Sequence, residues 1–232
     1  LEEVIGIRGE EGNGSLKDYG ITYSQVDLKD GTIDDESVLK AINEKTRLVF
    51  LQRSRGYEWR PALTIGEIER VIRLVKARKP DVVVMVDNCY GEFVEDREPT
   101  EAGADIMAGS LIKNPGGGLA PTGGYIVGSE ALIERISYRL TAPSVGREVG
   151  SYAASYQPFY QGLFMAPHVV AQAVRTATLA SAVFSAMGMR TTPAVDDPRT
   201  DIIQALELGT PERLIAFCQG IQMASPVDSM AL

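Results

Sequence analysis

Asp87 and Lys113 are the two side chains whose types and positions best suit chemistry. Asp87 closes the continuous apolar run 82–86, which has the pattern of a central parallel strand. Lys113 follows the short apolar segment 104–109 and precedes the three glycines 116–118. Because ligands bind outside the carboxyl ends of the strands in an open α/β sheet, we consider the carboxylate and the amine as candidates for one site.

Each of these two residues has a chemical and a structural interpretation. A carboxylate at Asp87 could hold a protonated ring nitrogen, a ribose hydroxyl or a metal ion, or it could cap the turn that follows. Lys113 could attack a carbonyl group if its setting keeps the amine partly deprotonated, or it could be a surface lysine in a flexible loop. Ser110, three residues earlier, could hold a phosphate together with backbone N–H groups. The pairing of Asp87 with Lys113 favours the chemical interpretation.

Other kinds of site have little support in the sequence. No dinucleotide fingerprint opens a helix after the first strand, and no P-loop motif occurs. One histidine and the two distant cysteines, Cys89 and Cys218, leave almost no material for a zinc site or a disulfide framework. We therefore predict no metal site, interpret Cys89 as a core cysteine and assign His168 no role.

The composition is that of a globular protein with a substantial core, because 44% of the 232 residues are hydrophobic and 23% are charged. The formal net charge is −8 and the basic residues are scattered, which argues against nucleic-acid binding. The apolar runs 82–86 and 177–186 are too short or too broken by polar residues to span a bilayer. We expect no membrane segment and, from the cysteine usage, a cytoplasmic location.

The elements that position Asp87 and Lys113 alternate between strand and helix. Thr64 and Glu67 have capping-box spacing, and the helix they begin precedes the strand that ends at Asp87. This order predicts an α/β fold with a mostly parallel sheet flanked by helices. A long helix after Pro167 suits a connection from a large domain, residues 1–167, into a partial small domain, residues 168–232. The predicted strands cover 21–26, 47–52, 82–86, 104–109 and 123–128, and the predicted helices cover 34–43, 64–79, 129–139 and 169–187, with a last helix from Thr210.

Three segments around the candidate site carry a family resemblance. They are Val-Asp-Asn-Cys-Tyr-Gly-Glu-Phe at 86–93, Ser-Leu-Ile-Lys-Asn-Pro-Gly-Gly-Gly at 110–118 and Pro-Thr-Gly-Gly-Tyr at 121–125. Together they resemble the methionine gamma-lyase-related group of the Cys/Met-metabolism enzymes, whose members are often called aluminium-resistance or cystathionine beta-lyase family proteins. The likeness extends over nearly the whole chain.

This resemblance implies the large domain of an aminotransferase-like (fold type I) enzyme, with pyridoxal 5'-phosphate (PLP) as cofactor. Asp87 would pair with the pyridine nitrogen, and Ser110 would contact the phosphate. Lys113 would form the Schiff base with PLP and later move protons at the α-carbon of the substrate. Three residues follow a strand at the site-facing end and are candidate contacts to the substrate or the phosphate, although each could instead form a pair at the surface: Arg53, Arg55 and Tyr57.

The implied activity is β- or γ-elimination on a sulfur-containing amino acid, in a homodimer or homotetramer. Transamination or racemisation stays an alternative, because a fold does not fix a reaction. The better-known gamma-lyases have a hydroxyl residue where this chain has Ile112, so one phosphate contact must come from elsewhere. Since the N-terminal phosphate-binding loop of the family has no counterpart here, we also interpret the chain as a fragment, and a non-catalytic role stays open.

Overall fold

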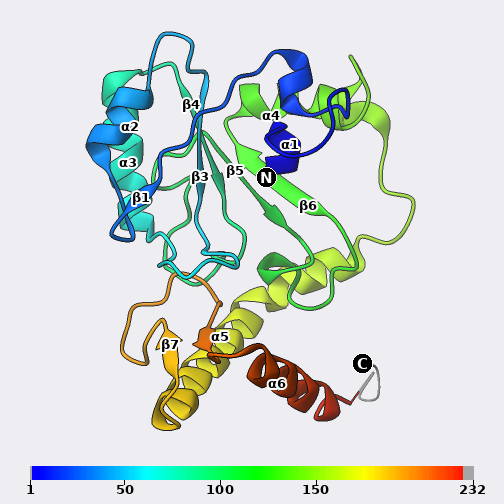
Figure 1. The fold of residues 1–232 in the computed structure, drawn as a ribbon. Coiled ribbons are helices and arrows are strands. Elements are labelled where there is room, and N and C mark those ends of the chain that lie inside the picture. The colour runs from blue at the N-terminus through cyan, green and yellow to red at the C-terminus, as the bar shows by residue number, and fades with distance from the viewer. Residues whose placement is uncertain (1, 227–232) are drawn as a thin grey trace.

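A four-stranded sheet forms the centre of the computed structural model, which describes residues 2–226 (Figure 1). Its strand order is β3 (Leu48–Gln52), β4 (Val83–Asp87), β5 (Ile106–Ser110) and β6 (Gly124–Gly128). The first three strands are parallel, and β6 is antiparallel to β5. The α/β prediction is confirmed, but the sheet is mixed. Parallel pairing needs a crossover connection, usually an α-helix, and the glycine-rich link from β5 to β6 contains only a short 3-10 turn.

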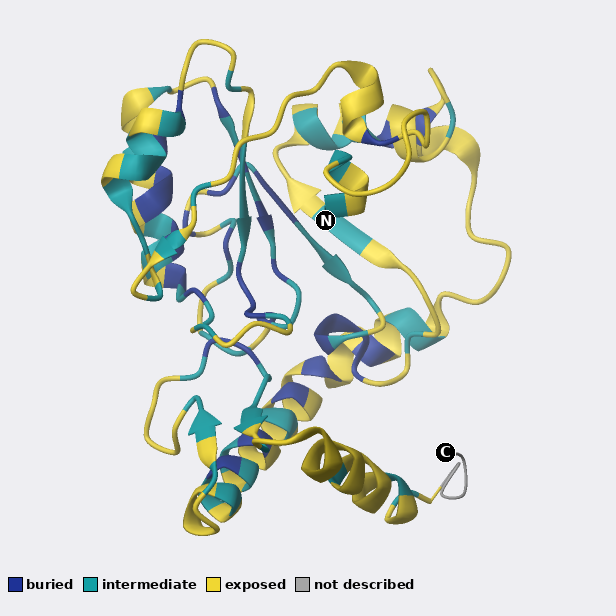
Figure 2. Cartoon of the chain, viewed as in Figure 1, coloured by how far each residue is buried: buried dark blue, intermediate teal, exposed yellow. Residues whose placement is uncertain are grey.

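One face of the sheet is covered by α2 (Asp35–Ala41) and α3 (Ile65–Arg78), as Figure 2 shows by the buried strip on α3. The predicted capping box is present, since the Thr64 hydroxyl accepts from the Glu67 N–H and the Glu67 carboxylate accepts from the Thr64 N–H. This start fixes the helix phase, and the apolar side chains then recur at helical spacing. The resulting core joins Ile65, Ile68, Val71, Ile72 and Val75 of α3 to Val82, Val84 and Val86.

The N-terminal part of the chain differs from the prediction. It contains α1 (Glu2–Ile5), the 3-10 turn η1 (Leu16–Tyr19) and a small hairpin of β1 (Leu28–Lys29) and β2 (Thr32–Ile33). The strand predicted over 21–26 is wrong, because this segment pairs with no strand of the described chain and its apolar residues Ile21 and Tyr23 are exposed. A β-branched alternating pattern needs a neighbouring edge before it forms a strand.

A 30-residue helix, α5 (Gln157–Ala186), leads away from the sheet toward the C-terminal segment. It follows α4 (Glu130–Leu140) and the 3-10 turn η3 (Gly146–Val149), and it precedes the hairpin of β7 (Arg190–Thr192) and β8 (Ala205–Glu207). The last helix is α6 (Pro211–Met223), capped by Thr210 as the sequence indicates. Of the predicted second domain, residues 227–232 lie outside the described residues.

The prediction that α5 begins only after Pro167 is wrong, because the helix starts at Gln157 and contains this proline. Close packing explains the difference. A Cβ on Gly162 would lie 2.1 Å from the carbonyl oxygen of Gly116, so the first half of α5 rests directly on the 3-10 turn η2 (Asn114–Gly116). Tertiary contact thus maintains a helix whose sequence favours a break.

The length of α5 also changes the membrane expectation. By length and composition α5 could cross a membrane: its most apolar 18-residue window has a mean hydropathy of 1.3, and 17% of that window is buried. The apolar run 177–186 is only the last third of this helix, so its full apolar length was not apparent from the sequence. A single helix of this kind also occurs in proteins that do not enter membranes, and here α5 packs against η2 and β7.

Candidate active site

The carboxyl ends of β4 and β5 bring the candidate residues to one edge of the sheet. Asp87 ends β4 and lies opposite Ala108 of β5 in the parallel register. Ser110 ends β5, and Lys113 lies three residues later, immediately before η2. In Figure 1 this edge faces the first half of α5. Residues separated by 26 positions therefore lie near the same side chain, Cys89, because two neighbouring parallel strands end side by side.

Asp87 is held from one side by Cys89. Its Oδ1 accepts from the Cys89 N–H at 3.1 Å and from the Cys89 thiol at 3.0 Å, while its Oδ2 accepts from no residue of the described chain. Burial raises the pKa of the Cys89 thiol to about 12, with further contributions from the hydrogen bond and the charge of Asp87, while the nearby Lys113 lowers it. The thiol thus stays protonated at neutral pH and orients the carboxylate.

The Lys113 amine lies over the ring of Tyr90, with Nζ 4.4 Å from the ring centroid. This is a cation–π contact. Tyr90 belongs to the turn that follows Asp87, and we did not single it out from the sequence, although its position three residues after Asp87 places it in the same loop. The Ser110 hydroxyl accepts from the Ile112 N–H at 3.3 Å, and the Ile112 side chain is exposed.

Arg53 lies in the interior and not at the open edge of the sheet. Its side chain is fully buried, with Nη2 2.7 Å from Glu95 Oε2 and Nη1 3.3 Å from Glu98 Oε2. Nη1 also donates to Asn88 Oδ1 at 2.8 Å. The guanidinium is therefore engaged beneath the turn that follows Asp87, and the expected contact with substrate or phosphate has no geometric support.

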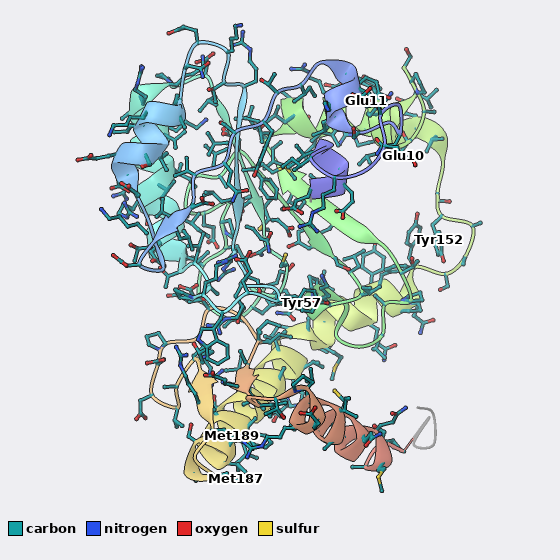
Figure 3. All side chains as sticks on the ribbon, in the orientation of Figure 1. Glu10, Glu11, Tyr57, Tyr152, Met187 and Met189 are labelled. Carbon is teal, nitrogen blue, oxygen red and sulfur yellow. The ribbon has the colours of Figure 1, made fainter. Side chains whose placement is uncertain are left out.

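The two other candidates near β3 also differ from each other in position. Arg55 is buried and donates from Nη1 to the carbonyl of Thr192, so it joins the end of β3 to the C-terminal segment. Burial lowers the pKa of Arg55, while the nearby Asp201 raises it. The Tyr57 side chain is fully exposed and lies near the end of the sheet that faces α5 (Figure 3). Within the described chain, neither Arg55 nor Tyr57 forms a hydrogen bond with Asp87 or Lys113.

A buried acid next to the site escaped the sequence analysis. Glu92 is 3% exposed, its Oε1 accepts from the Tyr125 hydroxyl at 2.7 Å, and its Oε2 has no partner in the described chain. Burial raises the pKa of Glu92 to about 7, and the charge of Glu98 raises it further, whereas Tyr125 and Arg53 lower it. The only local signal was an acidic residue between a glycine and a phenylalanine, which does not reveal burial.

Comparison with known proteins places this arrangement in a family. The family model described as methionine gamma-lyase matches residues 1–232, the whole chain. The chain belongs to the methionine gamma-lyase family. The resemblance inferred from the three site segments is thereby confirmed.

The chain is also similar to individual known proteins. The chain is 53% identical to the uncharacterized Bacillus subtilis protein YnbB and spans 55% of its length. It is 52% identical, with a TM-score of 0.97, to a Listeria monocytogenes crystal structure provisionally named as a cystathionine beta-lyase involved in aluminum resistance, of which it covers 57%. It also shares its fold, at a TM-score of 0.60 and 17% identity, with a Thermus thermophilus aspartate aminotransferase, covering 61% of that chain. The chain thus spans little more than half of these proteins.

The raised pKa of Glu92 predicts a pH-dependent stability. Between the ordinary pKa of 4.5 and about 7 the folded state binds more protons at Glu92 than the unfolded state, so stability falls as the pH rises through this window. Glu92→Gln removes this effect. Between pH 5 and pH 8, we expect the free energy of unfolding of the variant to rise by about 1 to 3 kcal/mol relative to that of the parent, as measured by urea denaturation. The same pH dependence in both proteins would contradict the assignment.

The contact between Asp87 and Cys89 predicts a change in thiol reactivity. Asp87→Asn removes the carboxylate charge that raises the pKa of Cys89, so more thiolate should form. In a Cys218→Ser background, which leaves Cys89 as the sole thiol, we expect alkylation by iodoacetamide at pH 9 to become at least about tenfold faster. An unchanged rate in a folded variant would show that Asp87 does not govern this thiol.

Proposed function

We propose that this chain binds PLP through Lys113 and Asp87 and carries part of the active site of a carbon–sulfur lyase. One observation supports this most strongly: adjacent parallel strands bring an amine and a carboxylate to the same edge of the sheet, where both charges act on the single thiol of Cys89. A carbonyl cofactor with a basic ring nitrogen requires these two groups.

The chemistry of the side chains fits PLP. Asp87 Oδ2 is available to accept from a protonated ring nitrogen, since Cys89 engages only Oδ1. Lys113 is half-buried and has an aromatic ring beside its amine. The Ser110 hydroxyl is half-buried at the end of β5, where it can donate to a phosphate oxygen. These three residues would hold the ring, the carbonyl carbon and the phosphate.

Each residue would have a distinct task. PLP, when bound, supplies an electron sink for the charge left at the α-carbon of an amino acid. Asp87 would keep the ring nitrogen protonated by accepting its hydrogen bond. Lys113 would hold the cofactor at its carbonyl carbon and, as a free amine, would take the proton from the α-carbon of the substrate with Nζ. Tyr90 would limit the positions open to that amine.

The proposed substrate is an amino acid with sulfur at the β or γ position, from which the thiol substituent is eliminated. The family description and the provisional name of the Listeria protein support this class. The expected homodimer or homotetramer and the cytoplasmic location rest on the resemblance and on composition. Arg55 remains a candidate contact for the substrate carboxylate or the phosphate, acting from the end of β3.

The role of Lys113 can be tested by trapping. After incubation with PLP and reduction with borohydride, we expect peptide mapping to find the cofactor on Lys113 and no adduct at that site in Lys113→Ala. With a thiol amino acid, release of ammonia and a 2-oxo acid should fall by about 10²- to 10⁴-fold in the same variant.

Lys40→Ala is the matched control, because Lys40 is exposed on α2 and, within residues 2–226, forms an ion pair only with Glu36. It should retain both the adduct and the activity. A folded parent chain that forms no adduct at Lys113, or a Lys113→Ala variant that keeps full activity, would overturn the proposal.

A further inference from the structure

The turn that follows Asp87 and the loop that carries Lys113 are joined by one side chain, that of Asn114. Its Nδ2 donates to the carbonyl of Tyr90 and to the carbonyl of Glu92, both at 3.0 Å. Asn114 is 5% exposed. An amide nitrogen has two protons to donate, so both are used in this bridge.

The turn needs such a partner because its backbone is unusual. Cys89 and Phe93 have φ values of 48° and 63°, which residues other than glycine seldom adopt. Carbonyl groups in a turn of this shape do not point toward a neighbouring strand, so they cannot join a regular ladder of backbone hydrogen bonds. Without Asn114 the buried carbonyl of Glu92 would lose this donor, and an unpaired buried carbonyl is costly.

On its opposite side, the turn is hydrogen-bonded to β6. The Glu92 carboxylate accepts from the Tyr125 hydroxyl, and Gly109 provides the space for this pair. A Cβ at Gly109 would lie 2.4 Å from Glu92 Oε1 and 2.7 Å from the Tyr125 hydroxyl oxygen. Glu92 is thus held through its side chain by β6 and through its main chain by Asn114.

The same bridge places Lys113 against Tyr90. Asn114 follows Lys113 directly and holds the carbonyl of Tyr90, whose ring lies 4.4 Å from the Lys113 amine. The distance between the main chain at Lys113 and this ring therefore depends on one pair of hydrogen bonds. A ring face attracts a cationic group and occupies the space around the amine.

We propose that Asn114 is a positioning residue for Lys113. By holding the main chain of Tyr90 and Glu92, it keeps the Lys113 amine on the face of the Tyr90 ring until a carbonyl ligand binds. The inference rests on the proposed function, because that function gives the Lys113 amine a ligand. The contact between the amine and the Tyr90 ring, however, is present without PLP. It can therefore be tested in the protein free of cofactor.

The test is acylation of Lys113 by limiting acetic anhydride in the cofactor-free chain, followed by peptide mass spectrometry. Lys17 and Lys40, whose side chains are exposed, serve as internal references. We expect Asn114→Ala and Tyr90→Leu each to raise the labelling of Lys113 about threefold relative to these lysines. The double variant should match Tyr90→Leu alone, because Asn114 acts through the ring.

Val75→Ala is the control for general destabilisation, since it opens a cavity in the core near the far end of α3 and should leave the labelling unchanged. If Asn114→Ala does not fold, Asn114→Asp keeps the shape and loses at least one of the two donated hydrogen bonds. In that case the inference is decided by the labelling of Lys113 in Asn114→Asp, which we expect to increase.

Three outcomes overturn the inference: no change in either Asn114 variant, a change matched by Val75→Ala, or effects of Asn114→Ala and Tyr90→Leu that multiply in the double variant. Failure of the proposed function would look different. In that case borohydride would trap no PLP on Lys113 of the parent chain, while the labelling pattern would still support the role of Asn114.

Discussion

A fully buried positive charge, the guanidinium of Arg53, is the constraint on which the architecture of the site depends. Removing an ion from water costs several kcal/mol unless charged partners and hydrogen bonds surround it. Glu95 and Glu98 supply the opposite charges, and Asn88 supplies a further acceptor. Because these partners all follow Asp87, the chain must fold back over the end of β3 to reach Arg53. This return path forms the turn beside the site.

Close packing against Arg53 also explains the composition of that turn. A Cβ on Gly91 would lie 2.5 Å from Arg53 Nη1, so only glycine fits above the guanidinium. The neighbouring Cys89 and Phe93 adopt left-handed backbone conformations, which cost about 1 to 3 kcal/mol each. The Phe93 N–H donates to Glu98 Oε1 at 2.9 Å, which helps to hold this shape. The charge network therefore stabilises the conformation that carries Tyr90.

The polar groups around the turn divide into two sets. Those that point inward have partners in the protein: Arg53 with the glutamates, Asn88 with Glu98, and Glu92 with Tyr125. Those at the open edge keep capacity for a ligand, namely Asp87 Oδ2 and the Lys113 amine. An arrangement that joins its interior side chains to one another and leaves an acid and an amine at the open edge suits a preformed binding site.

Local patterns in the sequence, namely periodicity, capping and strand ends, were enough to predict the core strand before Asp87, the capped helix α3, the α/β class and the position of Asp87 and Lys113 after neighbouring strands. Only the tertiary structure decided that Arg53 turns inward, that Tyr57 is exposed, that α5 begins before Pro167 and that Tyr90, Glu92 and Asn114 surround the site. The partners of Arg53 lie 35 to 45 residues away along the chain. Contacts over such distances leave no periodic signal, so the direction in which a polar side chain points is settled only when the fold brings its partner into reach.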